Sequence, residues 1–449
     1  MRDLFVTAII LSSLPLIFMR PWIGILMWSW IAYMNPHRLT WGFAYNMPFA
    51  ALVAGVTLLS VLFGRGKTEP WPRSGTLALW IVFVLWMCFT TLFALNPDEA
   101  TFELNRCLKI QLFAILTVWL MQGRERINWL VLVIVLSLGF FGVKGGLFAL
   151  RTAGTARVMG PPDSYIADNN TLALALIMTL PLMRYYLTET KKKWMRYALW
   201  AAMPITAISV LASQSRGALL ATISMLAFLL MRTKKRGFLA FLVVIGMPIL
   251  INWMPESWSS RMATIQTYEQ DGSAMGRISA WNFAWNLALH RPIVGGGFET
   301  FTPELFRIYA PTPDIVQGPH SIYFEVLGEH GFVGLALFLG LGFAAYRRAG
   351  AAVKLIDSRG EAAKELGWAR ELCAMLQTSL VGYAVGGAFL GLAYFDLPYH
   401  MIALILLTSS FVERKLGLVG LKEKKRPAYD FAREQGRPAD AQPHAPNTP

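Results

Sequence analysis

The chain has 449 residues, of which 55% are hydrophobic and only 15% are charged, and its formal net charge is +14. A soluble globular protein usually carries about 25% charged residues, so this chain has too few for a water-facing surface of its size. The composition excludes an ordinary soluble protein. It also argues against nucleic-acid binding, because the basic residues fall in short clusters between apolar runs and not on one soluble face.

Apolar runs that are long enough to cross a bilayer recur along the chain. A hydrocarbon core about 30 Å thick needs roughly 20 apolar residues in a helix. The candidate segments are 4–19, 22–34, 47–64, 75–95, 104–121, 127–150, 170–188, 196–212, 216–231, 237–254, 321–346, 375–393 and 399–413. Because Pro15, Arg20 and Pro21 interrupt the first two segments, we interpret these as one broken crossing. The prediction is an all-α polytopic integral membrane protein with about 12 transmembrane helices and both ends on the same side.

Lys and Arg are unevenly divided among the connections between these segments. The basic connections, at 65–74, 122–127, 189–196, 232–236 and 347–372, alternate with poorer ones at 35–46, 96–103, 151–169, 213–216, 255–320 and 394–398. The positive-inside rule places the basic set and the C-terminus in the cytoplasm. We therefore expect a transmembrane domain over 1–417 and a disordered, basic cytoplasmic tail over 418–449, which is rich in Lys, Pro, Ala and Gln.

The 255–320 connection is the largest element outside the predicted membrane spans, and a helical stretch within it starts at Arg277. Trp281, Trp285 and Leu289 recur in this stretch at helical spacing, which favours an interfacial anchor over a sugar-stacking surface. We expect Arg277 to open the helix, where its side chain and the free backbone amides together bind a phosphate.

Other polar residues lie on the outer side, which is otherwise poor in charge. Arg157, Arg216 and His320 come from three different outer segments, and Asp396 and His400 come from a fourth. Each of them taken alone is explained by a side chain that reaches the lipid headgroups. Their convergence on one side instead indicates a site. Arginines with one neutral histidine suit a phosphate-rich leaving group and a hydroxyl nucleophile.

Absent motifs narrow the chemistry further. The chain has no GxxxxGK[ST] loop, no Asp-x-Asp pair, no HExxH and no GxSxG. Its three cysteines, Cys88, Cys107 and Cys373, lie in or beside apolar segments without CxxC or His-paired spacing. We therefore expect no metal, no cofactor and no nucleotide-dependent reaction, and a donor carried by a membrane lipid fits better.

The chain resembles the O-antigen ligase and polymerase superfamily, specifically the O-glycosylation ligases associated with exosortase systems, from the first span to about residue 413. The shared motifs are MRDLFV at 1–6, GVKGGLF at 142–148, RVMGPP at 157–162, DNN at 168–170, SRG at 215–217, Gly276-Arg277 followed by Trp281, PHS at 319–321 and GEHG at 328–331. The order of these motifs around a long outer loop carries the resemblance.

The resemblance implies an inner-membrane glycosyltransferase of the GT-C type that works on the periplasmic side without a metal. Its partners would be a glycan on undecaprenyl diphosphate as donor, lipid A–core as acceptor, and membrane lipids. The family's catalytic histidine maps onto His320 as general base, and its paired arginines map onto Arg216 and Arg277, which would bind the diphosphate. An outer acidic residue maps onto Asp396. The family often has Asn where this chain has Ser321.

Several functions share this donor machinery. Ligation to lipid A–core, with inversion at the anomeric carbon, ranks first because an amphipathic acceptor would enter laterally beside 255–320. Protein O-glycosylation and polymerisation of O-antigen repeats are the alternatives, and the named residues do not separate the acceptors. A transporter of the lipid-linked glycan ranks last, since the sequence has neither the internal repeat nor the midplane polar groups typical of transporters.

Overall fold

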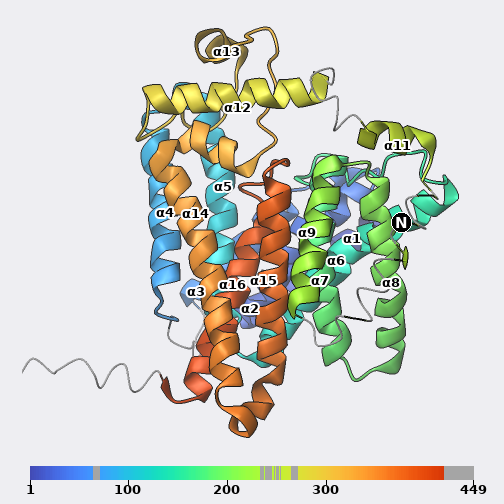
Figure 1. The fold of residues 1–449 in the computed structure, drawn as a ribbon. Helices are drawn as coiled ribbons and strands as arrows, with labels where there is room; N and C mark the ends of the chain where they lie inside the picture. Colours follow the sequence, from blue (N-terminus) through green and yellow to red (C-terminus); the bar gives the residue numbers. More distant parts are fainter. Residues whose placement is uncertain are drawn as a thin grey trace, which may run out of the picture.

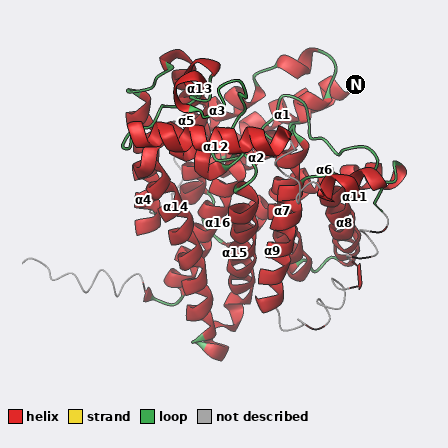
Figure 2. Cartoon of the chain, turned by 45° about the horizontal axis from the view of Figure 1, so that its top comes forward, coloured by secondary structure: helices red, strands yellow, loops and turns green. Residues whose placement is uncertain are grey.

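The computed structural model describes residues 1–63, 71–232, 254–263 and 272–418, together with single residues at 237, 245–246, 248 and 252. Every regular element in these residues is a helix (Figure 2). The first half contains α1 (Arg2–Met19), α2 (Pro21–Met34), η1 (Pro36–Leu39), η2 (Phe43–Asn46), α3 (Phe49–Phe63), α4 (Gly75–Thr91), α5 (Pro97–Leu120), α6 (Arg124–Arg151), α7 (Asn169–Glu189) and α8 (Lys193–Ala212). The second half contains α9 (Arg216–Arg232), α11 (Glu256–Ala263), α12 (Gly272–His290), α13 (Pro303–Tyr309), α14 (Ile322–Asp357), η4 (Gly360–Leu366), α15 (Gly367–Gly387) and α16 (Asp396–Lys415).

The long helices form one bundle, and α12 lies across its end with α13 beyond it (Figure 1). Helices α15 and α16 are buried along most of their length, because their apolar residues are not confined to one face. Five of the described helices, α1, α6, α7, α8 and α14, are long and apolar enough to cross a membrane, and α3 and α4 are shorter apolar helices. The all-helical membrane architecture is therefore confirmed, while the count of 12 spans stays a prediction.

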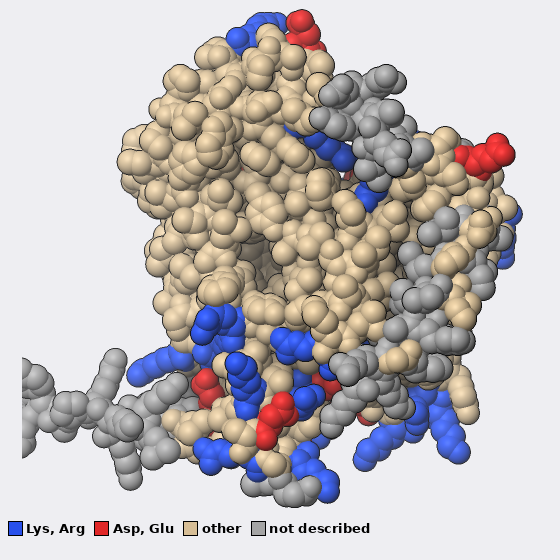
Figure 3. Space-filling view, viewed as in Figure 1, with Lys and Arg blue, Asp and Glu red and all other residues tan. Residues whose placement is uncertain are grey.

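The connections meet at two opposite ends of the bundle. At the end that carries α12, the contacts pair Arg38 with Asp163, Leu95 with Gly296, and Asn169 with Ser213. At the other end they pair Arg124 with Glu189, Gln122 with Arg414, and Arg348 with Glu413. On the face shown in Figure 3, Lys and Arg gather at this second end and the middle of the surface is nearly free of charge. We call the end with α12 the outer end. The full alternation of basic and poorer connections stays a prediction, because residues 64–70 and 233–236 of two basic connections lie outside the described residues.

The prediction of a single broken crossing over the first 34 residues is wrong. The Asp3 carboxylate accepts hydrogen bonds from the backbone of Gly42 and Ala44 at the outer end. The Ser60 hydroxyl donates to the carbonyl of Phe18 at the opposite end, 2.8 Å away. Helices α1 and α2 therefore run antiparallel, each through the bundle, and the N-terminal residues lie at the end opposite Lys415 and not on the same side. Two features misled the prediction. Arg20 and Pro21, which were read as an interruption of one crossing, mark the turn between two helices, and α2 has only 14 residues.

Helix α14 continues to Asp357, beyond the expected span 321–346, and it is broken near its start. Gly331 has φ 67°, a left-handed conformation that favours glycine. A Cβ atom at this position would lie 2.6 Å from the carbonyl oxygen of Ile293. The amides of Gly296 and Gly297 donate to the carbonyls of Gly328 and Glu329 across the same contact. The glycine run after α12 thus fixes the first turns of α14 against the outer loop.

Two predictions concern residues that lie largely outside the described part of the chain. The predicted span 237–254 lies outside the described residues except for a few single positions, and so does the tail from residue 419 onward. The three cysteines are free thiols, as expected from their spacing.

Candidate functional site

His320 lies in the turn between the outer loop and α14, and α12 holds this turn in place. The indole Nε1 of Trp281 donates a hydrogen bond of 2.8 Å to the carbonyl oxygen of Pro319. The Trp281 ring also stacks on Phe324, with ring centroids 5.1 Å apart and planes inclined by 10°. His320 itself has φ 42°, which is uncommon for a residue other than glycine. Contacts on both sides of the histidine therefore maintain an unfavourable backbone conformation.

Arg277 and Asp168 are the charged groups that act on His320. Burial lowers the pKa of His320 below its usual 6.5, the positive charge of Arg277 lowers it further, and the negative charge of Asp168 opposes this. Arg277 precedes Trp281 by four residues, so both side chains project from the same face of α12. The imidazole is consequently neutral at pH 7 and is available as a proton acceptor.

The expected position of Arg277 at the start of its helix is wrong. Helix α12 already includes Gly272, so Arg277 lies in its second turn and its amide is not among the first free N–H groups. The Trp stripe also divides in two. Trp281 supports the His320 turn, whereas Trp285 and Leu289 are 48% and 57% exposed, as expected of interfacial anchors. The helix terminus therefore lies apart from Arg277, and anion binding by the Arg277 side chain stays a prediction.

Arg216 and His320 lie on two sides of the segment Phe389–Gly391, which connects α15 to α16. A Cβ atom on Gly217, the neighbour of Arg216, would lie 2.8 Å from the Cβ of Phe389. A Cβ atom on Gly391 would lie 3.9 Å from the Cα of His320. The ring of Trp281 also approaches Phe389, at 6.3 Å between centroids. This short segment therefore brings together the positions predicted from three distant parts of the sequence.

The 151–169 loop is fixed to the turn that precedes Arg216. The Asn169 amide donates to the carbonyl of Ser213 at 2.6 Å, and the amide of Gln214 donates to the carbonyl of Gly154. The Arg157 guanidinium donates to the side-chain oxygen of Gln214 at 3.4 Å. Gln214 has φ 55°, a conformation that these hydrogen bonds on both sides stabilise. Arg157 thus contacts Gln214, which precedes Arg216 by two residues in the sequence.

Asp396 and His400 belong to the interior of the bundle. Asp396 is 3% exposed and accepts a hydrogen bond of 3.2 Å from the indole of Trp28 on α2. His400 is fully buried, and its Nδ1 lies 2.6 Å from the hydroxyl of Tyr33. The hydrogen bond to Trp28 therefore ties the Asp396 carboxylate to α2. The expected substrate contact of Asp396 has no support from its geometry.

Some polar residues near the site were given no role from the sequence, although Asp168 and Glu329 belong to the DNN and GEHG motifs. Asp168 begins α7 by accepting a hydrogen bond from the Asn170 amide, so its sequence signal is that of a helix cap. Glu329 accepts a hydrogen bond of 2.5 Å from the Tyr394 hydroxyl, and Glu325 accepts one from the amide of Ala393. Two glutamates four residues apart at the start of a span are a signal that could have been recognised; Glu329 is buried and Glu325 is half-buried. They fasten α14 to the connection that carries Gly391.

Comparison with known proteins gives two family matches. Residues 201–339 match the family model described as O-antigen ligase, and residues 1–191 match the model of a family of unknown function. No curated protein matches the chain. Arg216, Arg277 and His320 all fall within the first match. The chain therefore carries a domain of the O-antigen ligase family at residues 201–339.

Proposed function

We propose that the protein is an O-antigen ligase that transfers a glycan from undecaprenyl diphosphate to a sugar hydroxyl of lipid A–core. The observation that carries the proposal is the convergence of Arg216 and His320 on Phe389–Gly391, with Arg277 acting on His320 from α12. All three residues lie in the segment that matches the O-antigen ligase family.

The proposed mechanism is a direct displacement with inversion at the anomeric carbon. His320 accepts the proton of the acceptor hydroxyl while the hydroxyl oxygen attacks the anomeric carbon. The bond from this carbon to the diphosphate breaks, and the electron pair leaves with the diphosphate oxygen. Arg216 and Arg277 bind the departing diphosphate, and two guanidinium groups supply the positive charge that a divalent cation supplies in other glycosyl transfers.

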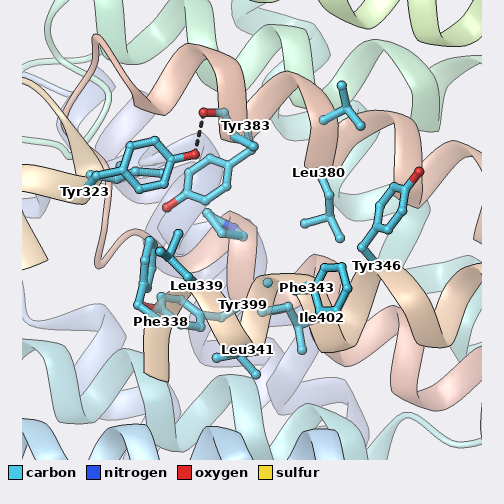
Figure 4. Close-up of a pocket in the computed structure, with 15 residues that line it drawn as sticks. Tyr323, Phe338, Leu339, Leu341, Phe343, Tyr346, Leu380, Tyr383, Tyr399 and Ile402 are labelled. Carbon is cyan, nitrogen blue, oxygen red and sulfur yellow. Dashed lines mark hydrogen bonds between the residues drawn. The ribbon is translucent and has the colours of Figure 1, made fainter. Parts of the chain in front are cut away.

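An apolar pocket beside the site supports a lipid-linked donor. It lies between α14, α15 and α16, and its lining begins with Ile322 and Tyr323, directly after the His320 turn. The Tyr323 hydroxyl donates to the carbonyl of Ala384, and the aromatic rings of Phe338, Phe343 and Tyr399 surround the pocket (Figure 4). This pocket would take part of the isoprenoid chain while the diphosphate meets the arginines.

The proposal places the protein in the bacterial inner membrane, with its outer end in the periplasm and residue 415 in the cytoplasm. The concentration of Lys and Arg at the opposite end supports this orientation (Figure 3).

Transfer by the purified protein from a lipid-linked glycan to added lipid A–core tests the function. Loss of a general base typically costs about 10²–10⁴-fold in rate, so His320→Ala is expected to lose transfer by that factor and to keep donor binding. His290→Ala, at the exposed end of α12, is the matched control and should keep the wild-type rate. Near-full transfer by His320→Ala would refute the mechanism. Transfer only to peptide would refute lipid A–core as the acceptor and select protein O-glycosylation, and elongation of the glycan alone would select polymerisation. A chelator should leave the rate of transfer unchanged.

A further inference from the structure

A second basic site lies at the outer end of the bundle, in the part of the chain that matches a family of unknown function. A cavity of about 600 Å³ opens there between α1, α2 and α6, and we call it the N-terminal groove. Its lining includes three cationic side chains, Arg2, Arg38 and Lys144, and no acidic side chain. Aromatic and aliphatic side chains form most of the remaining lining. The N-terminal groove thus combines positive charge with an apolar surface.

Lys144 is the unusual member of this set. Helix α6 ends at Arg151, seven residues later, so Lys144 lies about 10 Å below the outer end of the helix. Its neighbours Phe140 and Leu147 are each 42% exposed, on the lipid side of α6. Lys144 forms no salt bridge or hydrogen bond with any other residue that the structure describes. A lysine at this depth is costly unless an anion accompanies it.

A second cavity, of about 540 Å³, shares Phe140 and Lys144 with the N-terminal groove and continues along α6 towards the inner end. We call it the α6 groove. Its lining on α6 runs from Leu132 to Leu147, 16 residues that span about 22 Å, which is close to the length of an extended acyl chain. Lys144 is its only charged lining residue. A cationic groove that continues into a long apolar groove matches an amphiphile with a phosphate headgroup.

We propose that the N-terminal groove binds the headgroup phosphate of an anionic membrane glycerophospholipid at Arg2, Arg38 and Lys144, with one acyl chain of that lipid in the α6 groove. A small headgroup fits the enclosure, because Pro162 of the 151–169 loop and Trp41 of the η1–η2 turn both line the N-terminal groove. This site is separate from the residues around His320 and does not depend on the transfer reaction.

The bound lipid would act on the site through the 151–169 loop. Asp163, next to Pro162, forms a salt bridge of 3.4 Å with Arg38 and accepts a hydrogen bond of 2.7 Å from Tyr45. The same loop carries Arg157 and ends at Asp168, which acts on His320. Occupation of the N-terminal groove is therefore expected to stabilise a loop that contributes to both sites.

The test measures lipid binding to the delipidated, full-length protein in neutral detergent by native mass spectrometry. Phosphatidylglycerol is the probe, with phosphatidylcholine and inorganic phosphate as comparators. We expect one tightly bound phosphatidylglycerol, and we expect Lys144→Gln to weaken it about fivefold or more, the effect of one charge on an anionic lipid. The matched control is Lys109→Gln, since Lys109 is an exposed lysine within helix α5 and lines neither groove. Equal loss in both variants, or no loss in either, would overturn the proposal.

A second variant tests the acyl chain without removing charge. A Cβ atom on Gly139 would lie 3.7 Å from the Cε of Met183, in ordinary contact, so Gly139→Leu is expected to fold and to fill the α6 groove. It should weaken phosphatidylglycerol binding as well, and unchanged binding would overturn the placement of the chain. Binding of inorganic phosphate with the same affinity and the same dependence on Lys144 would show a free anion site and would also overturn the proposal.

Discussion

The hydrogen bond from Trp281 to Pro319 offers a test of how the protein positions its proposed base. Trp281→Phe keeps an aromatic ring against Phe324 but removes the indole donor, which lies 2.8 Å from the Pro319 carbonyl. Pro319 is buried, so its carbonyl would lose this partner without replacement by bulk water. Such a loss costs about 1–3 kcal/mol. If the whole cost is expressed in the geometry of His320, the rate of transfer falls by about 5- to 150-fold.

The assay is steady-state transfer from a lipid-linked glycan by purified protein at varied donor concentration, with kcat and KM measured separately. Trp281→Phe should lower kcat and leave the KM for donor nearly unchanged, because Trp281 acts through the His320 turn. The control is Trp285→Phe on the same helix, whose ring is 48% exposed. A thermal unfolding midpoint within a few degrees of wild type would show that the fold is intact. Equal kcat values for Trp281→Phe, Trp285→Phe and the wild type would refute the positioning role.

Three other measurements address the site, the kink and the topology. His320 has a lowered pKa and acts as a base only when neutral, so transfer should decline as pH falls through that lowered pKa. Asp168→Asn removes the negative charge that raises the pKa of His320, so it should shift this decline to still lower pH in a pH–rate profile. An unchanged profile would contradict the interaction between Asp168 and His320. Gly331→Ala places a Cβ atom on a residue with φ 67°, 2.6 Å from the carbonyl oxygen of Ile293, so it should destabilise the protein by about 1–3 kcal/mol in thermal unfolding. The control is Gly342→Ala in the same helix, whose Cβ atom would meet nothing within 4 Å and should leave the stability unchanged. In a Cys88→Ser background, Arg2→Cys should react with a membrane-impermeant maleimide that is added from the periplasmic side. Lys415→Cys should react only after permeabilisation. Labelling of both variants from the same side would contradict the antiparallel arrangement of α1 and α2.

The sequence allowed the site to be predicted where charge was unexpected for its position. Arg216, Arg277 and His320 stood out because they lie in outer segments that the positive-inside rule leaves poor in Lys and Arg. Asp168 was noted only as part of the DNN motif and was given no role at the site, and its hydrogen bond from the Asn170 amide is that of a helix cap. Its effect on His320 arises only when the 151–169 loop folds against α9. Local sequence patterns identify residues in unusual positions. They do not identify a residue such as Asp168, which caps its own helix and also acts on a residue that is distant in the sequence.

The errors in the fold came from rules that average over many helices. The prolines, Arg20 and the short second segment led to the merging of α1 and α2, although the 14 residues of α2 form a separate helix that packs against α1, α3, α5 and α6. The prediction placed the start of α12 at Arg277, whereas the helix also includes Gly272-Ser273-Ala274-Met275-Gly276, which contain two glycines and form no apolar stripe. The side chain of Gln317 occupies the space that a Cβ atom on Gly276 would take, which explains a glycine within this helix. Contacts of this kind have no counterpart in the local sequence.

The segment Phe389–Gly391 has a consequence for exchanging parts between related enzymes. It lies after residue 339, outside both family matches, yet Gly217 and His320 pack against it. Arg157 and Asp168 come from the other match, at residues 1–191. A chimera that transplants only residues 201–339 would therefore bring the arginines and histidine of one enzyme against the supporting loop and turn of another. Functional chimeras should instead move residues 151–170 and 388–396 together with that segment, so that substrate preference can be exchanged without separating the site from its supports.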